Sequence, residues 1–462
     1  MAFISEKQSL NPIVVRNISF ILALLVALFC LPLIFQLVIV VESYKALPSS
    51  EISLVDAFSP ALGAYAIGAT IVICWYRTFS ALIIYSLAFG MRILLGYLLG
   101  GIFTYDDERN LHGLAKEIAS AWRHGNIQPH SEPYPNIVAV LYFVFRPNIL
   151  LPKTMNALIG SLLPFFVYDL AHLIGNNKRV ARIILYFTAF APPLVVYSGV
   201  NLKEVMTAAL MILPFWSYLR IKPRFIGFVG CLAALVILVK FRAVYGGLAI
   251  IGVLFLILAG KRVNRQSRNT NRRLLVGVGV SAGVGLMLLL LPSPIQSFIF
   301  WRINSAYAAE KFQFVANHAT IGQFLATDQG LSPQNLIILT LRPLISPHPF
   351  RFVVDQSFAT LIESTVMTIW YILLPLACIG AWHNRLNGYV LTWALVTLVG
   401  VITVGLASYL GGDPYRHRIA LFPFLYLLSG LGIPQVKQYR RVLWVWVLVV
   451  TAFTGLYFRL RI

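Results

Sequence analysis

The chain has 462 residues, of which 59% are hydrophobic and 11% are charged, and its mean hydropathy is +0.79. These proportions leave too little polar surface for a soluble globule, and apolar stretches of about 20 residues recur along the sequence. The net charge of +21 gathers mostly in segments that alternate with these stretches, as in the cytoplasmic loops of membrane proteins. It therefore reflects membrane topology, and nucleic acid is excluded as a partner.

The apolar stretches predict an all-α polytopic membrane protein, one transmembrane domain over 1–462, with about 13 transmembrane helices. The first stretch lacks a small-residue cleavage pattern, so we interpret it as a retained helix. The four cysteines all lie inside apolar stretches and offer neither a disulfide framework nor zinc-ligand spacing. In chain order we expect helices near 18–41, 57–75, 79–103, 154–174, 183–200, 204–220, 225–241, 243–260, 274–292, 363–382, 388–410, 418–433 and 442–458.

Basic residues assign the sides of the membrane. With the N-terminus in the cytoplasm, the inner segments hold most of the unpaired positive charge, including six basic residues and no acid between 261 and 273. The outer segments then include two long ones, 104–153 and 293–362. Nearly all acidic residues lie on this outer face, whereas an ion-coupled carrier is expected to place ionisable groups near the middle of the bilayer.

The outer segment 104–153 opens with three consecutive acids, Asp106, Asp107 and Glu108. Apolar residues follow at helical spacing, which predicts an amphipathic helix lying flat on the membrane: Leu111, Leu114, Ala115, Ile118 and Trp122. Acids stabilise the first turn of a helix, so helix capping, with Thr104 as the cap, is one explanation for the acidic run. A second amphipathic stretch is expected over 293–314.

Basic residues also lie at outer helix ends, where the positive-inside rule disfavours them. Lys240 and Arg242 occupy one tight turn, and Arg416 and Arg418 occupy another. Side chains that reach along the membrane surface are one explanation, and binding of a lipid phosphate is another. The sequence "NLKE" (201–204) adds Lys203 and Glu204 on the same face, either as a helix-start pair or as part of the same site.

Several stretches resemble the GT-C glycosyltransferases. "DDERNLHGLAKEIASAWRHG" is similar to the D-E-x-x-Y-x-x-x-A stretch of that family's first large outer loop, with Asp107 and Glu108 at D-E, Leu111 where Tyr is usual, and Ala115 at Ala. Residues 141–183, 191–204 and 416–430 are similar to later elements in the same order. The resemblance is to the dolichyl-phosphate-mannose-protein mannosyltransferase and aminoarabinose-transferase branch, especially its small bacterial members. Two additional spans before the acidic loop and the absence of a carbohydrate-binding insert depart from it.

The resemblance implies an inverting transferase that uses a polyprenyl-phosphate-linked sugar as donor and a hydroxyl of a lipid, glycan or protein as acceptor. It implies that Asp107 is the general base, with Asp106 as the reserve candidate and Glu108 beside them. Lys203, Lys240, Arg242, Arg416 and Arg418 would bind the donor phosphate. Glu204 would support the site or bind a metal; some branches use a divalent metal and others do not, so no cofactor is assigned.

Two other classes of function stay open. A lipid-glycan flippase or another transporter would need polar residues along a path through the membrane, where Arg92 and Asp169 are the candidates. A polysaccharide polymerase or ligase with a diphosphate-linked donor would use Arg and His in a late outer loop, where His348 and Arg351 lie. In each case we expect a multi-pass protein in a bacterial plasma membrane, surrounded by membrane lipids, with its site on the outer face. For Arg92, the sequence suggests a place along a groove for the lipid tail.

Overall fold

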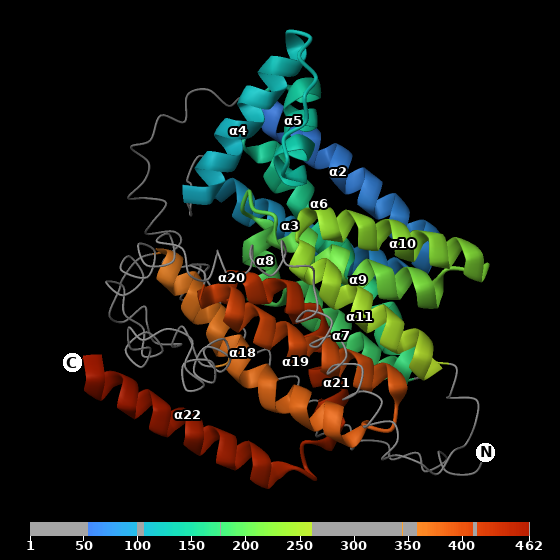
Figure 1. The fold of residues 1–462 in the computed structure, drawn as a ribbon, viewed down its shortest axis with the longest axis vertical. Helices are drawn as coiled ribbons and strands as arrows, with labels where there is room; N and C mark the ends of the chain where they lie inside the picture. Colours follow the sequence, from blue (N-terminus) through green and yellow to red (C-terminus); the bar gives the residue numbers. More distant parts are fainter. Residues whose placement is uncertain are drawn as a thin grey trace, which may run out of the picture.

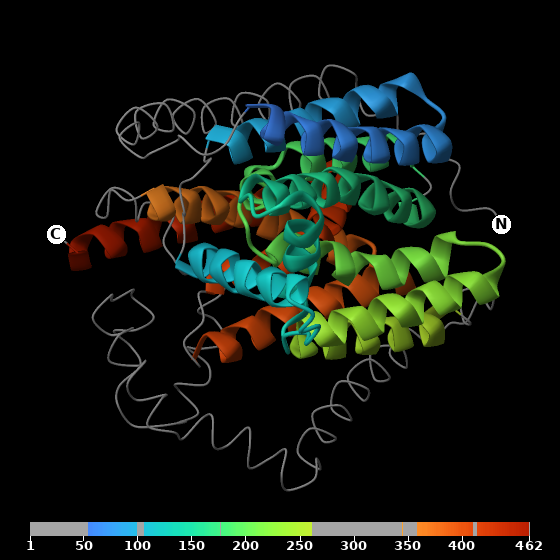
Figure 2. The ribbon, with the colours of Figure 1, turned by 90° about the horizontal axis from the view of Figure 1, so that it is seen from above.

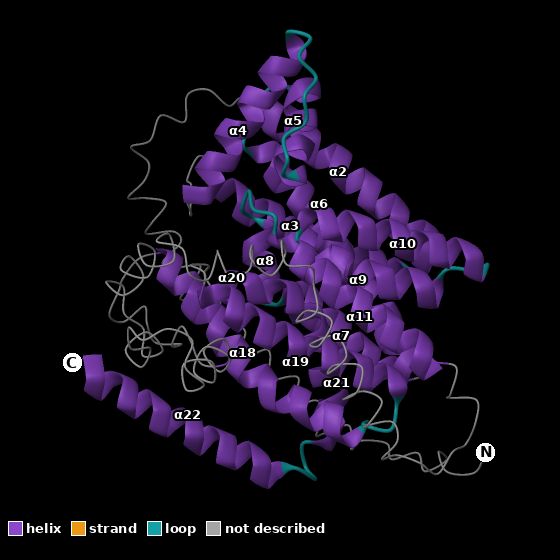
Figure 3. Ribbon diagram, in the orientation of Figure 1, coloured by secondary structure: helices purple, strands orange, loops and turns teal. Residues whose placement is uncertain are grey.

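The computed structural model describes residues 54–98, 106–175, 177–260, 344, 358–409 and 414–461. Within these ranges the chain is helical and contains no strand (Figure 3). The helices expected near 18–41 and 274–292, the amphipathic stretch 293–314, His348 and Arg351 lie outside the described residues.

The helices run in close succession and are joined mostly by short turns (Figure 1). They are α2 (Leu54–Tyr76), α3 (Phe79–Leu98), α4 (Asp106–Arg123), α5 (Pro133–Phe145), α6 (Leu150–Gly175), α7 (Lys178–Phe190), α8 (Pro192–Ser198), α9 (Glu204–Arg220), α10 (Arg224–Phe241), α11 (Ala243–Gly260), α18 (Phe358–His383), α19 (Gly388–Tyr409), α20 (Pro414–His417), the 3-10 turn η1 (Arg418–Leu421), α21 (Phe422–Gly432), the 3-10 turn η2 (Ile433–Gln435) and α22 (Arg440–Arg461). Figure 2 shows α2 and α3 on one side of the bundle and α10 and α11 on the other.

Five described helices are long and apolar enough to cross a membrane, which makes the chain a multi-pass membrane protein. They are Ser59–Tyr76, Phe79–Tyr97, Leu150–Ile174, Arg224–Phe241 and Ile362–His383. The pair α7 and α8 makes a sixth if the two helices form one span. The expected total of about 13 is not confirmed: the helices expected near 18–41 and 274–292 lie outside the described residues, and of the described stretches only these qualify by length and composition.

The single helix expected over 183–200 is instead broken. The helices α7 and α8 meet at Ala191 with a bend of 43°. Pro192 and Pro193 start α8, and proline has no N–H to donate to the carbonyl four residues earlier. The carbonyl of Ala189, which Pro193 would otherwise have to satisfy, therefore needs another donor.

Arg92 supplies that donor. Its Nη1 donates to the carbonyl of Ala189 at 2.8 Å and to that of Ala88 at 2.9 Å, and its Nε donates to Ser198 Oγ at 3.2 Å. The side chain is fully buried. The expectation that Arg92 lines a groove for lipid is thus wrong: a buried guanidinium holds the break between α7 and α8.

The amphipathic helix expected after residue 104 is confirmed as α4. Ala115 and Ile118 are buried in the main hydrophobic core, and Leu111, Leu114 and Trp122 pack against it. Figure 1 shows α4 lying across the direction of the bundle helices, as expected of a helix on a membrane surface. The three acids occupy its first turn.

The helix α5 was not expected, and α6 begins at Leu150 rather than near 154. The helices α4 and α5 pack side by side. His112 Nδ1 lies 2.6 Å from Tyr142 Oη, and Arg123 Nη2 donates to the carbonyl of Tyr142 at 2.6 Å. Residues 106–145 of the segment 104–153 therefore form a helical hairpin and not a loop with one helix.

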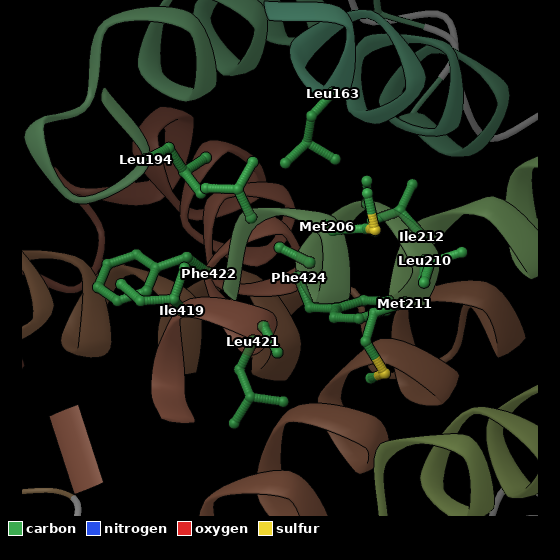
Figure 4. Packing of buried hydrophobic residues seen from close by; sticks show 14 of the residues in the cluster. Leu163, Leu194, Met206, Leu210, Met211, Ile212, Ile419, Leu421, Phe422 and Phe424 are labelled. Atoms are coloured by element: carbon green, nitrogen blue, oxygen red, sulfur yellow. The ribbon is translucent and has the colours of Figure 1, made fainter. Parts of the chain in front are cut away.

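Apolar side chains join the start of α9 to the segment that follows α20. In Figure 4, Phe424 lies beside Met206 and Met211 of α9, and Phe422 lies farther from α9, next to Ile419. The rings of Phe215 and Phe424 meet edge to face at 5.5 Å. This contact fixes two segments that are about 200 residues apart in sequence.

The other end of α9 carries a separate polar cluster. Asp169 Oδ2 lies 3.5 Å from Arg220 Nε and accepts hydrogen bonds from Trp216 Nε1 at 3.0 Å and Trp75 Nε1 at 3.3 Å. Asp169 is thus bound near the end of α6, and Arg92 is bound elsewhere. Neither of the two side chains considered for a transport path pairs with the other.

Candidate functional site

The site is built around the loop 199–203, which links α8 to α9. Asn156 of α6 is fully buried, and its Nδ2 donates to two carbonyls of this loop, Val200 and Leu202, both at 2.8 Å. Tyr134 of α5 donates its hydroxyl to Asn201 Oδ1 at 2.9 Å. Because these bonds come from two different helices, the loop is held in one conformation, and it delivers Lys203 and Glu204 to the start of α9.

Glu108 binds the same loop from α4. Its side chain is fully buried, and Oε1 accepts the backbone N–H of Asn201 at 2.5 Å. The buried ammonium of Lys153 interacts with Glu108 electrostatically. Glu108 therefore fixes α4 on the loop and is not accessible to a substrate.

Asp107 points away from this anchor, to the surface. Its side chain is 58% exposed, and its Oδ2 forms an ion pair with Arg416 Nη1 at 2.8 Å. Asp106 is the first residue of α4, but its side chain lies outside the described residues. Adjacent residues on a helix point in different directions, which separates the roles of Asp107 and Glu108.

A second carboxylate, that of Glu204, forms a buried ion pair with Arg416. Glu204 Oε1 lies 3.2 Å from Arg416 Nη2 and 3.6 Å from Arg242 Nη2, and only 3% of its side chain is exposed. Four segments distant in sequence, at 107, 204, 242 and 416, therefore meet in one charge cluster. Lys203 lies at its edge, paired with Glu132 Oε2 at 2.9 Å.

A small cavity of about 10 Å³ opens beside this cluster, which is room for about one water molecule. Its lining comes from α9, the α10–α11 turn, α11, α20 and η1: Glu204, Thr207, Arg242, Tyr245, Arg416, His417 and Ala420. Glu204 Oε2 is buried and has no hydrogen-bond partner among the described residues. Glu204 thus brings to the lining of this cavity a carboxylate whose second oxygen has no hydrogen-bond partner within the described ranges.

The cluster changes the protonation of its neighbours. Burial and the charges of Arg242, Arg416 and Lys203 lower the pKa of His417 to about 4, although Glu204 acts in the opposite direction. His417 is therefore neutral at pH 7. Burial alone would lower the pKa of Arg416, but Glu204, Tyr197 and Asp107 together hold it above its ordinary value.

Two of the basic residues predicted for the site lie away from it. Lys240 is exposed at the end of α10, and no contact joins it to the cluster within the described ranges. Arg418 is fully buried, with its guanidinium 5.4 Å from the ring centre of Trp370 and a further contact to Met367 Sδ. Within the turn "RHR", Arg416 is the residue that forms ion pairs with Asp107 and Glu204.

Several residues of the site were not predicted. Glu132, Tyr134 and Asn156 position the loop or its Lys203, and His417 lines the cavity. His417 stands between two arginines that were singled out, which was a usable signal. Asn156 had only its polar side chain within an apolar helix as a sign of function.

A metal site finds no support in the part of the chain that the structure describes. There, no three His, Cys, Asp or Glu side chains come together as metal ligands would. Around Glu204 the neighbours are arginines, whose charge opposes a bound cation.

Comparison with known proteins identifies no relative of the chain: no protein-family model, no curated protein and no solved structure matches it.

Proposed function

We propose that the protein is a membrane glycosyltransferase that moves a sugar from a polyprenyl-phosphate donor to an acceptor hydroxyl on the outer face of the membrane. The observation that supports this most is the meeting of Asp107 with Arg416, Glu204 and Arg242 at one end of the bundle. A general base and two phosphate-binding groups are what such a transfer requires. The resemblance of the acidic stretch to GT-C enzymes points in the same direction.

In the proposed reaction, Asp107 accepts the proton of the acceptor hydroxyl while that oxygen forms a bond to the anomeric carbon. The bond from this carbon to the phosphate oxygen breaks, and its electron pair leaves with the polyprenyl phosphate. Arg416 and Arg242 stabilise the negative charge on the phosphate. A single displacement of this kind inverts the anomeric configuration. The donor lipid would lie in the membrane with its head group at this rim.

The transport alternative is less well supported by the contacts. Arg92 binds backbone carbonyls at the α7–α8 break, and Asp169 binds Arg220 and two tryptophans. Both side chains hold the bundle together in the described structure. The alternative with a diphosphate-linked donor depends on residues outside the described ranges, and the experiment below includes it.

The test is to incubate the purified protein with a short-chain polyprenyl-phosphate sugar and to measure the released polyprenyl phosphate. A diphosphate-linked sugar and a flipping assay in vesicles serve as the alternatives. We expect release from the monophosphate donor only. Turnover of the diphosphate donor, or flipping without turnover, would contradict the proposal.

Asp107→Asn should lower turnover by about 100-fold or more, the usual effect of losing a general base. Asp106→Asn should be much milder. Glu117→Gln is the matched control, since Glu117 is an exposed carboxylate on the same helix, two turns and more from the cluster. Full turnover in Asp107→Asn would remove Asp107 from the role of base.

A further inference from the structure

Arg416 is bound by two carboxylates of very different accessibility. Its Nη1 pairs with Asp107, which is 58% exposed, and its Nη2 pairs with Glu204, which is 3% exposed. We propose, building on the function above, that the donor phosphate replaces Asp107 on Arg416, so that binding of the donor releases the base. The donor then binds before the acceptor can react.

Glu204 is the fixed partner of Arg416. It lies in the first turn of α9, buried, with Arg242 on the same oxygen that contacts Arg416. Taking one member out of a buried ion pair leaves an unpaired charge away from water, which is strongly unfavourable. An incoming anion therefore cannot replace Glu204 without disrupting the site.

Asp107 is the replaceable partner. The Asp107 side chain is 58% exposed whereas that of Arg416 is 12% exposed, so water solvates the carboxylate when the pair separates, and the phosphate takes its place on the guanidinium. A phosphate presents several acceptor oxygens and can bind the planar guanidinium through two of them. The carboxylate of Asp107, once released, remains at the surface, where it can face the acceptor hydroxyl on the side of the sugar opposite the phosphate, as inversion requires.

The charges of the cluster explain why an exchange is needed. The cations Arg416 and Arg242 face Glu204 and Asp107, and Lys203 faces Glu132. Each positive charge of the cluster is thus matched by a carboxylate before any ligand binds. Arg242 is 25% exposed and contacts only the oxygen that Glu204 shares with Arg416, whereas Nη1 of Arg416 becomes available to a phosphate only if Asp107 moves away.

The experiment measures the affinity of a short-chain polyprenyl monophosphate without sugar, by calorimetry in detergent, for the parent and three variants. Asp107→Asn should bind this lipid about two- to fivefold more tightly, because the carboxylate that competes with the phosphate for Arg416 is lost. Glu204→Gln should bind it at least about tenfold more weakly, because its arginines lose their anchor. Glu117→Gln should match the parent. Removing the charge of Asp107 would thus strengthen lipid binding, and removing the charge of Glu204 would weaken it, although both carboxylates pair with Arg416.

Asp107 is exposed, so Asp107→Asn is expected to fold, and the sign of its effect decides the inference even if Glu204→Gln does not fold. Equal or weaker binding by Asp107→Asn would overturn the exchange while leaving the proposed transferase intact. A parent protein that does not bind the lipid at all would overturn the transferase itself. Inorganic phosphate in place of the lipid should give the same order of variants if the head group alone drives the exchange.

Discussion

At the scale of single residues, two arginines two positions apart make different contacts. Arg416 forms ion pairs with Asp107 and Glu204, whereas Arg418 is buried with its guanidinium over the ring of Trp370. The chain changes from α20 to the 3-10 turn η1 between them, and residues two apart on a helical turn face different directions. The sequence places both at the same level of the membrane but cannot tell which one faces the bundle.

His417, between these arginines, makes the stability of the protein depend on pH. Its pKa is about 4 in the folded protein and 6.5 ordinarily. The unfolded chain therefore binds more protons than the folded chain between these values. The contribution of neutral His417 to the free energy of unfolding is fully present above about pH 6.5 and is lost as the pH falls towards 4. The total loss is at most about 3 kcal/mol.

We therefore expect the thermal unfolding temperature in detergent to fall between pH 6.5 and pH 4, and the His417→Asn variant to show a smaller fall. The groups that face His417 are Arg242, Glu204, Arg416 and Lys203. His112, whose pKa burial also lowers to about 4, adds to the slope in both proteins and cancels in the comparison. Identical slopes in the two proteins would mean that His417 titrates normally in the fold.

The sequence identified the charged residues of the site better than their roles. Asp107, Glu204, Arg242 and Arg416 were all chosen from sequence, and the structure brings them together. Glu108 was predicted together with Asp106 and Asp107 as a catalytic candidate on the outer face. It is instead buried and accepts a hydrogen bond from the backbone N–H of Asn201 in the loop 199–203. A one-residue step around a helix decides this difference, and only the packing of α4 shows which residue faces inward.

At the scale of elements, hydrophobic length located the helices well. The bounds of α9 and α11 match the expected 204–220 and 243–260. The hairpin helix α5 was missed because 13 residues are too few for a crossing and two prolines open it. The break between α7 and α8 was also missed, although Pro192 and Pro193 in the sequence were a direct signal of it.

The α7–α8 break leads to a prediction for Arg92. Arg92→Met removes the donor to the Ala189 carbonyl and should lower the free energy of unfolding by about 1–3 kcal/mol. Because Ser198 contacts Arg92 and is followed directly by the loop 199–203, the amides of this loop should also exchange faster with deuterium. Lys178→Met, an exposed basic residue at the start of α7, is the control and should change neither measurement. Unchanged exchange in Arg92→Met would show that the break does not position the loop.

At the scale of the whole molecule, the contacts define two ends of the bundle. One end holds Asp107, Glu204 and Arg416, and the other holds Asp169 and Arg220. The helix α9 joins them, since it begins at Glu204 and ends at Arg220. The alternation of spans in the sequence predicts the same grouping. The side of the membrane that each end faces rests on the distribution of basic residues alone.

Cysteine labelling tests the side that each end faces. Ser120 of α4 and Lys222, in the turn between α9 and α10, are exposed residues near opposite ends. The background needs Cys30, Cys74, Cys231 and Cys378 replaced, since Cys74 and Cys378 are exposed. In intact cells, a membrane-impermeant thiol reagent should label Ser120→Cys, and it should label Lys222→Cys only after the membrane is opened.

The labelling result also bears on the donor, because a lipid-linked sugar is expected only if the site lies on the outer face. A site on the outer face has no ready supply of nucleotide sugars, which is the reason to expect a donor carried by a lipid phosphate. If only Lys222→Cys were labelled in intact cells, the cluster around Arg416 would face the cytoplasm, and that reason would be lost. If both positions were labelled from the same side, α9 would not cross the membrane, and the assignment of two opposite ends would fail. If only Ser120→Cys is labelled in intact cells, the cluster of Asp107 and Arg416 lies on the outer face, where the sugar donor has to be carried by a lipid.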